Sequence, residues 1–94
     1  MEKDKLLRMI KEVIFEKVGE FNGLNHPESI TNNDELGADM AFDSLDFVEV
    51  VMEMEKRTGR CIPDEVLDVK PYYELTVGEL TNMLYNYLKD YEKR

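Results

Sequence analysis

The sequence predicts an all-α fold, a small four-helix bundle of three longer helices and one short helix, forming a single domain over residues 1–94. Three observations predict it. Apolar residues recur at three- and four-residue steps in three separate stretches, a pattern typical of helices with one buried face. Residues that favour a helix start, Asp43 and Thr76, stand before two of these stretches. A length of 94 residues suits one small core.

The first predicted helix runs from Glu2 to about Val18. Its expected buried stripe is Leu6, Met9, Ile10, Val13, Ile14 and Val18. A long loop follows, because glycine, proline and asparagine are concentrated in residues 19–42. Loops of this length are uncommon in small domains unless they are ordered, so we expect a loop that crosses the bundle. The apolar residues expected to hold it on the core are Ile30, Leu36 and Met40.

The central helix is expected to begin after Asp43, a favoured N-cap, with Asp46 placed to interact with the positive end of the helix dipole. Basic side chains followed by Gly59 predict its end. The hydroxyl of Ser44 falls in the first turn, where free backbone N–H groups favour an anion. A serine in this position is usually only a cap, so spacing alone assigns it no function. The expected buried face is Leu45, Val48, Val51 and Met52.

A short helix is expected from Pro63, carrying Val66, Leu67 and Val69, and Pro71 should end it. The last helix follows Thr76, which forms a predicted capping box with Glu79 three residues later. Its expected inward stripe is Val77, Leu80, Leu84, Tyr87, Leu88 and Tyr91.

The net charge of −9 is concentrated in the middle of the chain. Residues 21–55 contain nine acids and no lysine or arginine, whereas both flanking stretches are balanced. Such a surface repels nucleic acid and anionic membranes and attracts basic protein surfaces, so it favours a docking role. A single cysteine, together with the lack of a signal-peptide pattern and of a long apolar run, favours a cytoplasmic protein without membrane insertion.

Residues for catalysis or metal binding are sparse. The one histidine, His26, has no cysteine or histidine at a ligand spacing, and no base accompanies Ser44 in sequence. We therefore expect no catalytic residue and no metal site.

One stretch resembles a known family. Asp43-Ser44-Leu45-Asp46-Phe47-Val48-Glu49-Val50-Val51-Met52, followed by Ile62-Pro63-Asp64-Glu65, is similar to the second helix and following loop of acyl carrier proteins. The resemblance implies the bundle of that family and a carrier that is not itself an enzyme. It also implies that Ser44 carries 4′-phosphopantetheine, delivered from coenzyme A by a phosphopantetheinyl transferase, with Asp43 and Leu45 flanking the attachment site. The thiol of the arm then carries acyl groups as thioesters.

The resemblance also implies that the protein is a monomeric carrier that presents its cargo to acyl-transferring or condensing enzymes with basic patches, in fatty-acid or polyketide-type synthesis. The helix after Ser44 would dock onto these enzymes. The implied docking residues are Asp43, Asp46, Glu49 and Glu53. The implied lining of an apolar cleft for the acyl chain is Leu45, Val48, Val51 and Met52.

Three departures from the family's usual pattern favour a specialised carrier. They are Ala41-Phe42 before the motif, the bulky Phe47, and a longer segment around Tyr72-Tyr73. Two alternatives stay open. One is a carrier of aminoacyl or peptidyl groups; the other is an unmodified acidic interaction module of the same fold, against which the intact Asp-Ser-Leu motif argues.

Overall fold

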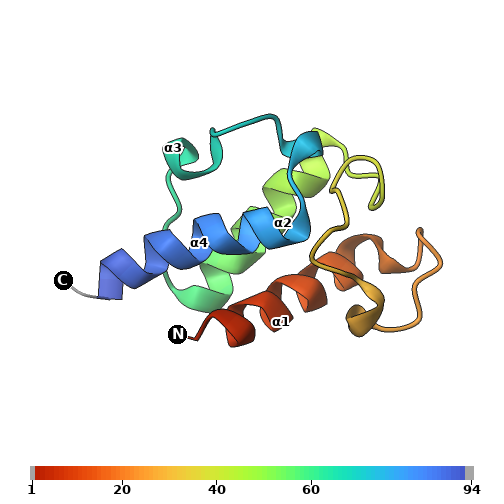
Figure 1. Cartoon of the computed structure of the whole chain (residues 1–94), viewed down its shortest axis with the longest axis horizontal. Helices are drawn as coiled ribbons and strands as arrows, with labels where there is room; N and C mark the ends of the chain where they lie inside the picture. The colour runs from red at the N-terminus through yellow and green to blue at the C-terminus, as the bar shows by residue number, and fades with distance from the viewer. Residues whose placement is uncertain (1, 93–94) are drawn as a thin grey trace.

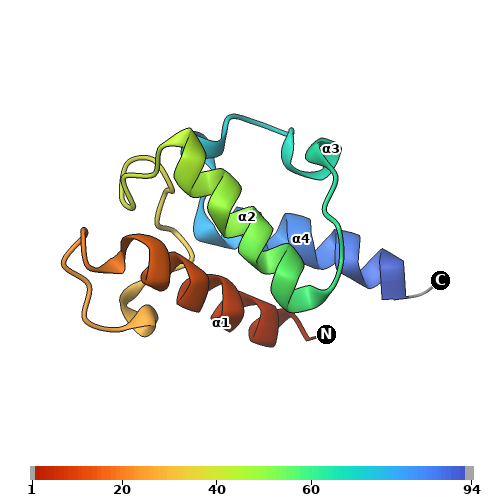
Figure 2. The same cartoon turned by 180° about the vertical axis from the view of Figure 1, so that it is seen from behind.

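The computed structural model describes residues 2–92 and contains α1 (Lys3–Ile14), α2 (Ser44–Thr58), α3 (Asp64–Leu67) and α4 (Val77–Glu92). Figures 1 and 2 show α1 running antiparallel to α4, with α2 packed obliquely against α1. Three short turns complete the fold: η1 (Phe15–Gly19), η2 (Pro27–Ser29) and η3 (Tyr72–Glu74). Residues 2–92 form no strand beyond one isolated bridge between Glu35 and Thr76. The predicted all-α bundle is confirmed.

The first helix is longer than α1 itself, because η1 continues it as a π-helical turn to Gly19. The ring of Phe15 lies over Gly19, where an added Cβ would come within 2.7 Å of it. Glycine is therefore required by close approach at this position. The predicted stripe is buried except for Met9, which is half-buried. Its buried members are Leu6, Ile10, Val13, Ile14 and Val18.

The long loop is ordered and crosses to the start of α4, as predicted. Its apolar anchors Ile30, Leu36 and Met40 are all buried. Backbone hydrogen bonds join it to the segment around Thr76: Leu36 N–H donates to Leu75 C=O at 2.9 Å, and Val77 N–H donates to Asp34 C=O at 2.9 Å. These bonds and the buried anchors hold the loop against the core. The loop therefore fixes the position from which the chain enters α2.

The buried face predicted for α2 is wrong in three of its four residues. Leu45, Val48 and Met52 are 61, 48 and 60% exposed, and only Val51 is buried. The face that packs on the core contains Val50, Val51 and Met54, with Phe47 half-buried beside them. Helix α2 therefore has apolar residues on two faces, and periodicity alone does not show which of them meets the other helices.

The short helix α3 is present as predicted but ends at Leu67, so Val69 lies beyond it and is exposed. The sequence did not predict η3, which follows Pro71. The Lys70 ammonium lies 2.8 Å from the Glu79 carboxylate and joins this segment to α4. That contact lowers the pKa of Glu79 below its usual 4.5.

Helix α4 begins with the predicted capping box. Thr76 N–H donates to the Glu79 carboxylate at 3.0 Å, and Glu79 N–H donates to the Thr76 hydroxyl at 3.1 Å. Tyr87 is half-buried, and its hydroxyl donates to the Cys61 carbonyl at 2.9 Å. The side chain of Tyr91, also predicted to face inward, lies outside the described part of the structure. The buried members of the predicted stripe are Val77, Leu80, Leu84 and Leu88.

Arg57, in the last turn of α2, joins α2 to α1 through carboxylates on both helices. Its guanidinium lies 2.8 Å from Glu16, 3.0 Å from Glu53 and 3.7 Å from Glu12. The hydrogen bond from Arg57 holds the pKa of Glu53 below its usual 4.5. The same bond, with that to Glu16, raises the pKa of Arg57. One cation therefore attracts three carboxylates across the α1–α2 contact.

Replacing Arg57 by glutamine should lower the melting temperature by roughly 1–4 °C at neutral pH, because three largely exposed carboxylates lose their shared cation. The pKa of Glu53 is lowered on folding, so the unfolded chain binds the proton first as the pH falls. This stabilisation is complete above pH 4.5, the usual value, and disappears below it. Thermal melts from pH 7 to about pH 3.5 should show the variant and wild type converging; a constant gap would contradict the assignment.

Candidate functional site

Ser44 is the first residue of α2 and is exposed. Helix geometry leaves the backbone N–H groups of Ser44 and Leu45 without acceptors inside the helix, because the carbonyls they would need lie before its start. These donors and the helix dipole favour a negatively charged group at this end. The position therefore combines an accessible hydroxyl with a favourable environment for a phosphate ester.

A reciprocal capping box fixes the helix start at this serine. Asp43 accepts a hydrogen bond from Asp46 N–H at 2.8 Å, and Asp43 N–H donates to the Asp46 carboxylate at 3.0 Å. The predicted N-cap is confirmed. These two bonds close the first turn and define its backbone, which holds Ser44 in one place.

The chain enters this cap through a left-handed turn. Ala41 has φ 55°, a conformation that favours glycine, and its N–H donates to the Gly37 carbonyl at 3.1 Å. The next residue, Phe42, is buried, and its N–H donates to the Leu36 carbonyl at 2.9 Å. Packing of Phe42 therefore stabilises a turn that alanine alone disfavours, and the turn directs the chain into α2.

Acidic side chains lie along α2 beyond the first turn. Glu49 is 3.9 Å from the Lys17 ammonium and its side chain is 43% exposed, so this pair is loose. Glu53 is held more tightly by Arg57, at 3.0 Å. The exposed apolar residues of the same helix form a second feature, which we call the apolar strip: Leu45, Val48 and Met52.

The features of this site match one family in the comparisons with known proteins. The family model described as "Phosphopantetheine attachment site" matches residues 6–84, which includes the whole of α2. The chain belongs to the acyl carrier protein family. It is therefore a carrier and not an enzyme, and its cofactor is covalently attached 4′-phosphopantetheine.

Individual carriers match over most of the chain. The acyl carrier protein of Bradyrhizobium sp. (strain ORS 278) is 35% identical over 75 residues, covering 80% of this chain and 84% of that protein. That of Karelsulcia muelleri (strain GWSS) is 34% identical over 87 residues, covering 93% and 94%. The mitochondrial acyl carrier protein of Neurospora crassa is 35% identical over 68 residues, covering 72% of this chain and 48% of its own length.

The carrier has an aromatic cluster beside α2 that sequence reasoning did not assemble. The rings of Phe47 and Tyr72 stack with centroids 5.5 Å apart at 27°, and Tyr73 meets Tyr72 edge-on at 5.4 Å. Phe47 and the Tyr72-Tyr73 segment both depart from the usual pattern of the family. Phe47 and Tyr72 are 25 positions apart in the sequence, so no local pattern predicts their contact. Only the path of the chain through α3 and η3 brings them together.

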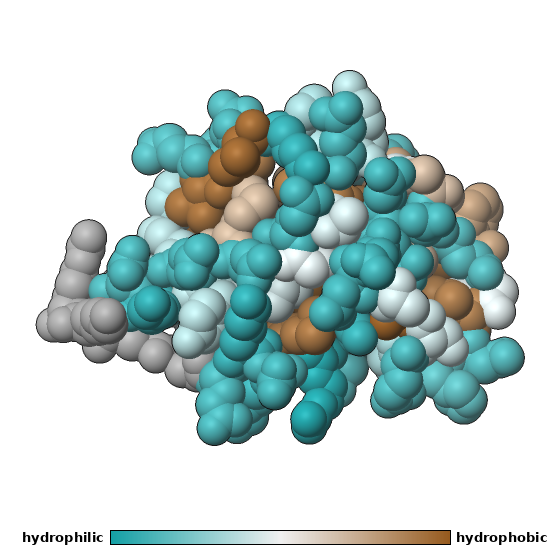
Figure 3. Space-filling model, in the orientation of Figure 1, coloured by the Kyte–Doolittle hydropathy of each residue, from teal (hydrophilic) through white to brown (hydrophobic). Residues whose placement is uncertain are grey.

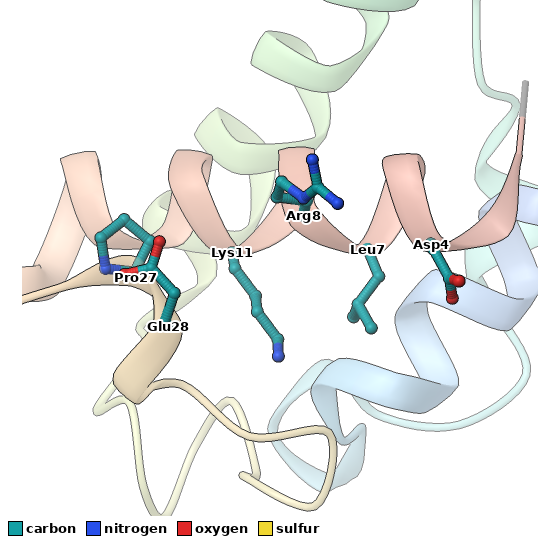
Figure 4. Close-up of a pocket in the computed structure, with 6 residues that line it drawn as sticks. All are labelled: Asp4, Leu7, Arg8, Lys11, Pro27 and Glu28. Atoms are coloured by element: carbon teal, nitrogen blue, oxygen red, sulfur yellow. The ribbon is translucent and has the colours of Figure 1, made fainter.

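Two of the hollows on the described surface lie on different sides of the carrier. One, of about 310 Å³, lies between α1 and η2; Figure 4 shows Leu7 and Lys11 extending from α1 across it. Its rim carries both signs of charge, from Asp4, Arg8, Lys11 and Glu28. The second hollow adjoins the aromatic cluster and is lined in part by Phe47 and Tyr72.

The described residues, 2–92, include no helix with the length and apolar content of a membrane span. Among the same residues, no group of three or more His, Cys, Asp or Glu side chains is placed to bind a metal ion.

Proposed function

We propose that Ser44 is the residue that carries the 4′-phosphopantetheine arm, with Asp43 and Leu45 flanking it. One observation carries the proposal: an exposed serine begins a capped helix inside the segment that matches the phosphopantetheine-attachment family. The residues fit the arm. Its phosphodiester is an anion, and the helix start offers the N–H groups of Ser44 and Leu45 together with the positive end of the dipole.

Ser44 acts as an acceptor in this proposal. The carboxylates beside it in the first turn, those of Asp43 and Asp46, are weak bases and are poorly suited to remove the proton of an alcohol. A phosphopantetheinyl transferase supplies that chemistry: the serine oxygen bonds to the phosphorus that carries the arm in coenzyme A, the pyrophosphate P–O bond breaks, and adenosine 3′,5′-bisphosphate leaves, while a base of the transferase takes the serine proton.

The exposed side of α2 is proposed as the docking surface for the transferase and for acyl-transferring or condensing enzymes. The apolar strip gives such a surface a centre, and the acidic residues beside it favour a partner with a basic rim. Glu49 should contribute more than Glu53, because its bond to Lys17 is long and is easily exchanged for a partner's cation. The proposed acidic residues are Asp43, Asp46, Glu49 and Glu53.

The proposed cargo is an acyl intermediate of fatty-acid or polyketide-type synthesis, bound to the arm as a thioester. Of the four residues first expected to line an apolar cleft, only Val51 faces the interior. Leu45, Val48 and Met52 are assigned to docking in the proposal, because exposed apolar side chains that lie together on one helix face suit a partner protein.

Incubation with coenzyme A and a broad-specificity phosphopantetheinyl transferase should add the mass of one arm to the wild type and nothing to Ser44→Ala. The matched control is Ser29→Ala, which replaces an exposed serine in η2 and should be modified like the wild type. Intact-protein mass spectrometry reads the result. An unmodified wild type, or a modified Ser44→Ala protein, would refute the assignment.

A further inference from the structure

We propose that Lys17 selects the partners that dock on α2: its ammonium occupies the Glu49 carboxylate in the free carrier, and a partner binds by replacing it with an arginine. The two groups lie 3.9 Å apart, across the contact between η1 and α2. This inference rests on the docking surface proposed above for the exposed side of α2. It adds the residue of the carrier that competes with the partner and the kind of side chain that the partner must offer.

Lys17 reaches α2 from outside the acidic part of the chain. Residues 21–55 contain no lysine or arginine, so a basic side chain in contact with Glu49 has to come from another segment. Lys17 lies in the middle of η1, the turn in which the ring of Phe15 lies against Gly19. Figure 3 shows many hydrophilic side chains on the face formed by α1 and α4, so a charge on the first helix is by itself an ordinary solvated group. The contact with Glu49 is what distinguishes Lys17.

The pair of Lys17 and Glu49 borders the apolar strip. Leu45 precedes Glu49 by four residues on α2 and Met52 follows it by three, so the three side chains are neighbours on the helix surface. A partner that covers the apolar strip therefore meets the pair as well and removes water from it. A dehydrated ion pair needs close hydrogen bonds to offset its lost hydration. At 3.9 Å the ammonium is beyond hydrogen-bond distance, so the pair suits the free carrier and not the docked one.

The charge of Lys17 also acts beyond Glu49. The pKa of Glu53 is held below its usual 4.5 chiefly by the hydrogen bond from Arg57, and the charge of Lys17 makes a smaller contribution in the same direction. Glu49 and Glu53 are one helix turn apart, so Lys17 opposes the negative potential over the middle of α2. It therefore weakens the attraction of basic partners in general, and a partner able to displace it regains that attraction.

The replacing side chain should be an arginine. A guanidinium forms two parallel hydrogen bonds with a carboxylate, whereas an ammonium binds as a point charge. A partner's lysine would offer Glu49 only what Lys17 already supplies, so the exchange would gain little. Lys17 is able to leave, because its side chain is 33% exposed and its ammonium ends a flexible stem.

The test measures kcat and KM for arm attachment by the transferase at low ionic strength. Lys17→Gln should raise kcat/KM about threefold and leave kcat unchanged, because it clears Glu49 for the partner. Lys17→Arg should lower kcat/KM although the net charge is the same, because arginine holds Glu49 by two bonds. Melting temperatures should change little, since exposed ion pairs contribute little to stability.

Lys5→Gln is the matched control. It removes the same charge from an exposed position of α1, twelve residues before Lys17 and roughly 18 Å from it along the helix. In a Glu49→Gln background, Lys17→Gln should act no more strongly than Lys5→Gln, and Lys17→Arg should have no effect. Equal rates for Lys17→Gln and Lys5→Gln, or a Lys17→Arg carrier that is modified as fast as the wild type, would overturn the proposal.

The arginine is tested on the transferase, by changing its exposed arginines to lysine one at a time. One of these changes should slow attachment to the wild-type carrier and slow attachment to the Glu49→Gln carrier much less. The absence of any such coupled arginine would overturn the assignment of the partner side chain. Mass spectrometry of the wild type verifies attachment at Ser44 beforehand, so a failure of the proposed function is seen as a carrier without an arm. A failure of docking on α2 is seen separately, as equal rates for Glu49→Gln and the wild type.

Discussion

Reversing Glu49 to lysine should slow arm attachment by on the order of tenfold at low ionic strength, mainly through the association rate. Glu49 stands on the exposed side of α2, within two turns of Ser44, and the Lys17 ammonium is 3.9 Å from its carboxylate. A partner's basic side chain can take the place of that loose contact. The difference between variant and wild type should shrink as salt is added, because screening weakens steering.

The measurement is the transferase rate at several salt concentrations, with melting temperatures to show that each protein is folded. Glu49→Gln separates loss of charge from reversal and should give an intermediate rate. The control is Asp90→Lys, an exposed acid near the end of α4, which lies far from the start of α2 (Figure 1). Glu12 is unsuited as a control because it lies 3.7 Å from Arg57. Equal slowing by Glu49→Lys and Asp90→Lys would refute a docking face on α2.

The helix starts of this chain could be predicted from the sequence because capping is local chemistry. The sequence predicts Asp43 as an N-cap and Thr76 with Glu79 as a capping box, and both form. The return bond from Asp43 N–H to Asp46, which makes the first cap a box as well, was not predicted. The anchors of the long loop could be predicted for a related reason. Isolated apolar residues in a polar segment have few alternatives to the core, and Leu36 is completely buried.

The contacts that shape the candidate site could not be predicted in this way. The hydrogen bond from Arg57 to Glu53 joins residues four positions apart, so helix spacing predicts it. The bond from Arg57 to Glu16 joins residues 41 positions apart, and no local pattern predicts it. The orientation of α2 depends on which apolar face meets α1 and α4, and Val48 and Val51 are equivalent by residue type. Only packing distinguishes them. The need for glycine at position 37 also depends on packing, because Tyr73, 36 positions later in the sequence, lies directly against it.

Replacing Gly37 by alanine should destabilise the carrier by about 1–3 kcal/mol, the usual cost of overpacking, with a fall in melting temperature of roughly 4–8 °C for each kcal/mol. An added Cβ would lie 2.6 Å from Tyr73 Cβ, 2.8 Å from Tyr73 O and 3.0 Å from Tyr73 Cα. Two of these atoms are backbone, so a side-chain rotation cannot relieve the contact. Gly37 does not have a positive φ, and its requirement for glycine is therefore one of space.

The same substitution should also disturb the aromatic cluster, because moving Tyr73 moves Tyr72 relative to Phe47. Thermal melts measure the effect on stability. Ala38→Ser is the control, since it changes the adjacent, exposed loop residue and should alter stability by no more than about 0.5 kcal/mol. If Gly37→Ala melts like Ala38→Ser, the long loop is free to move away from η3, and the close approach of Tyr73 to Gly37 does not restrain the fold.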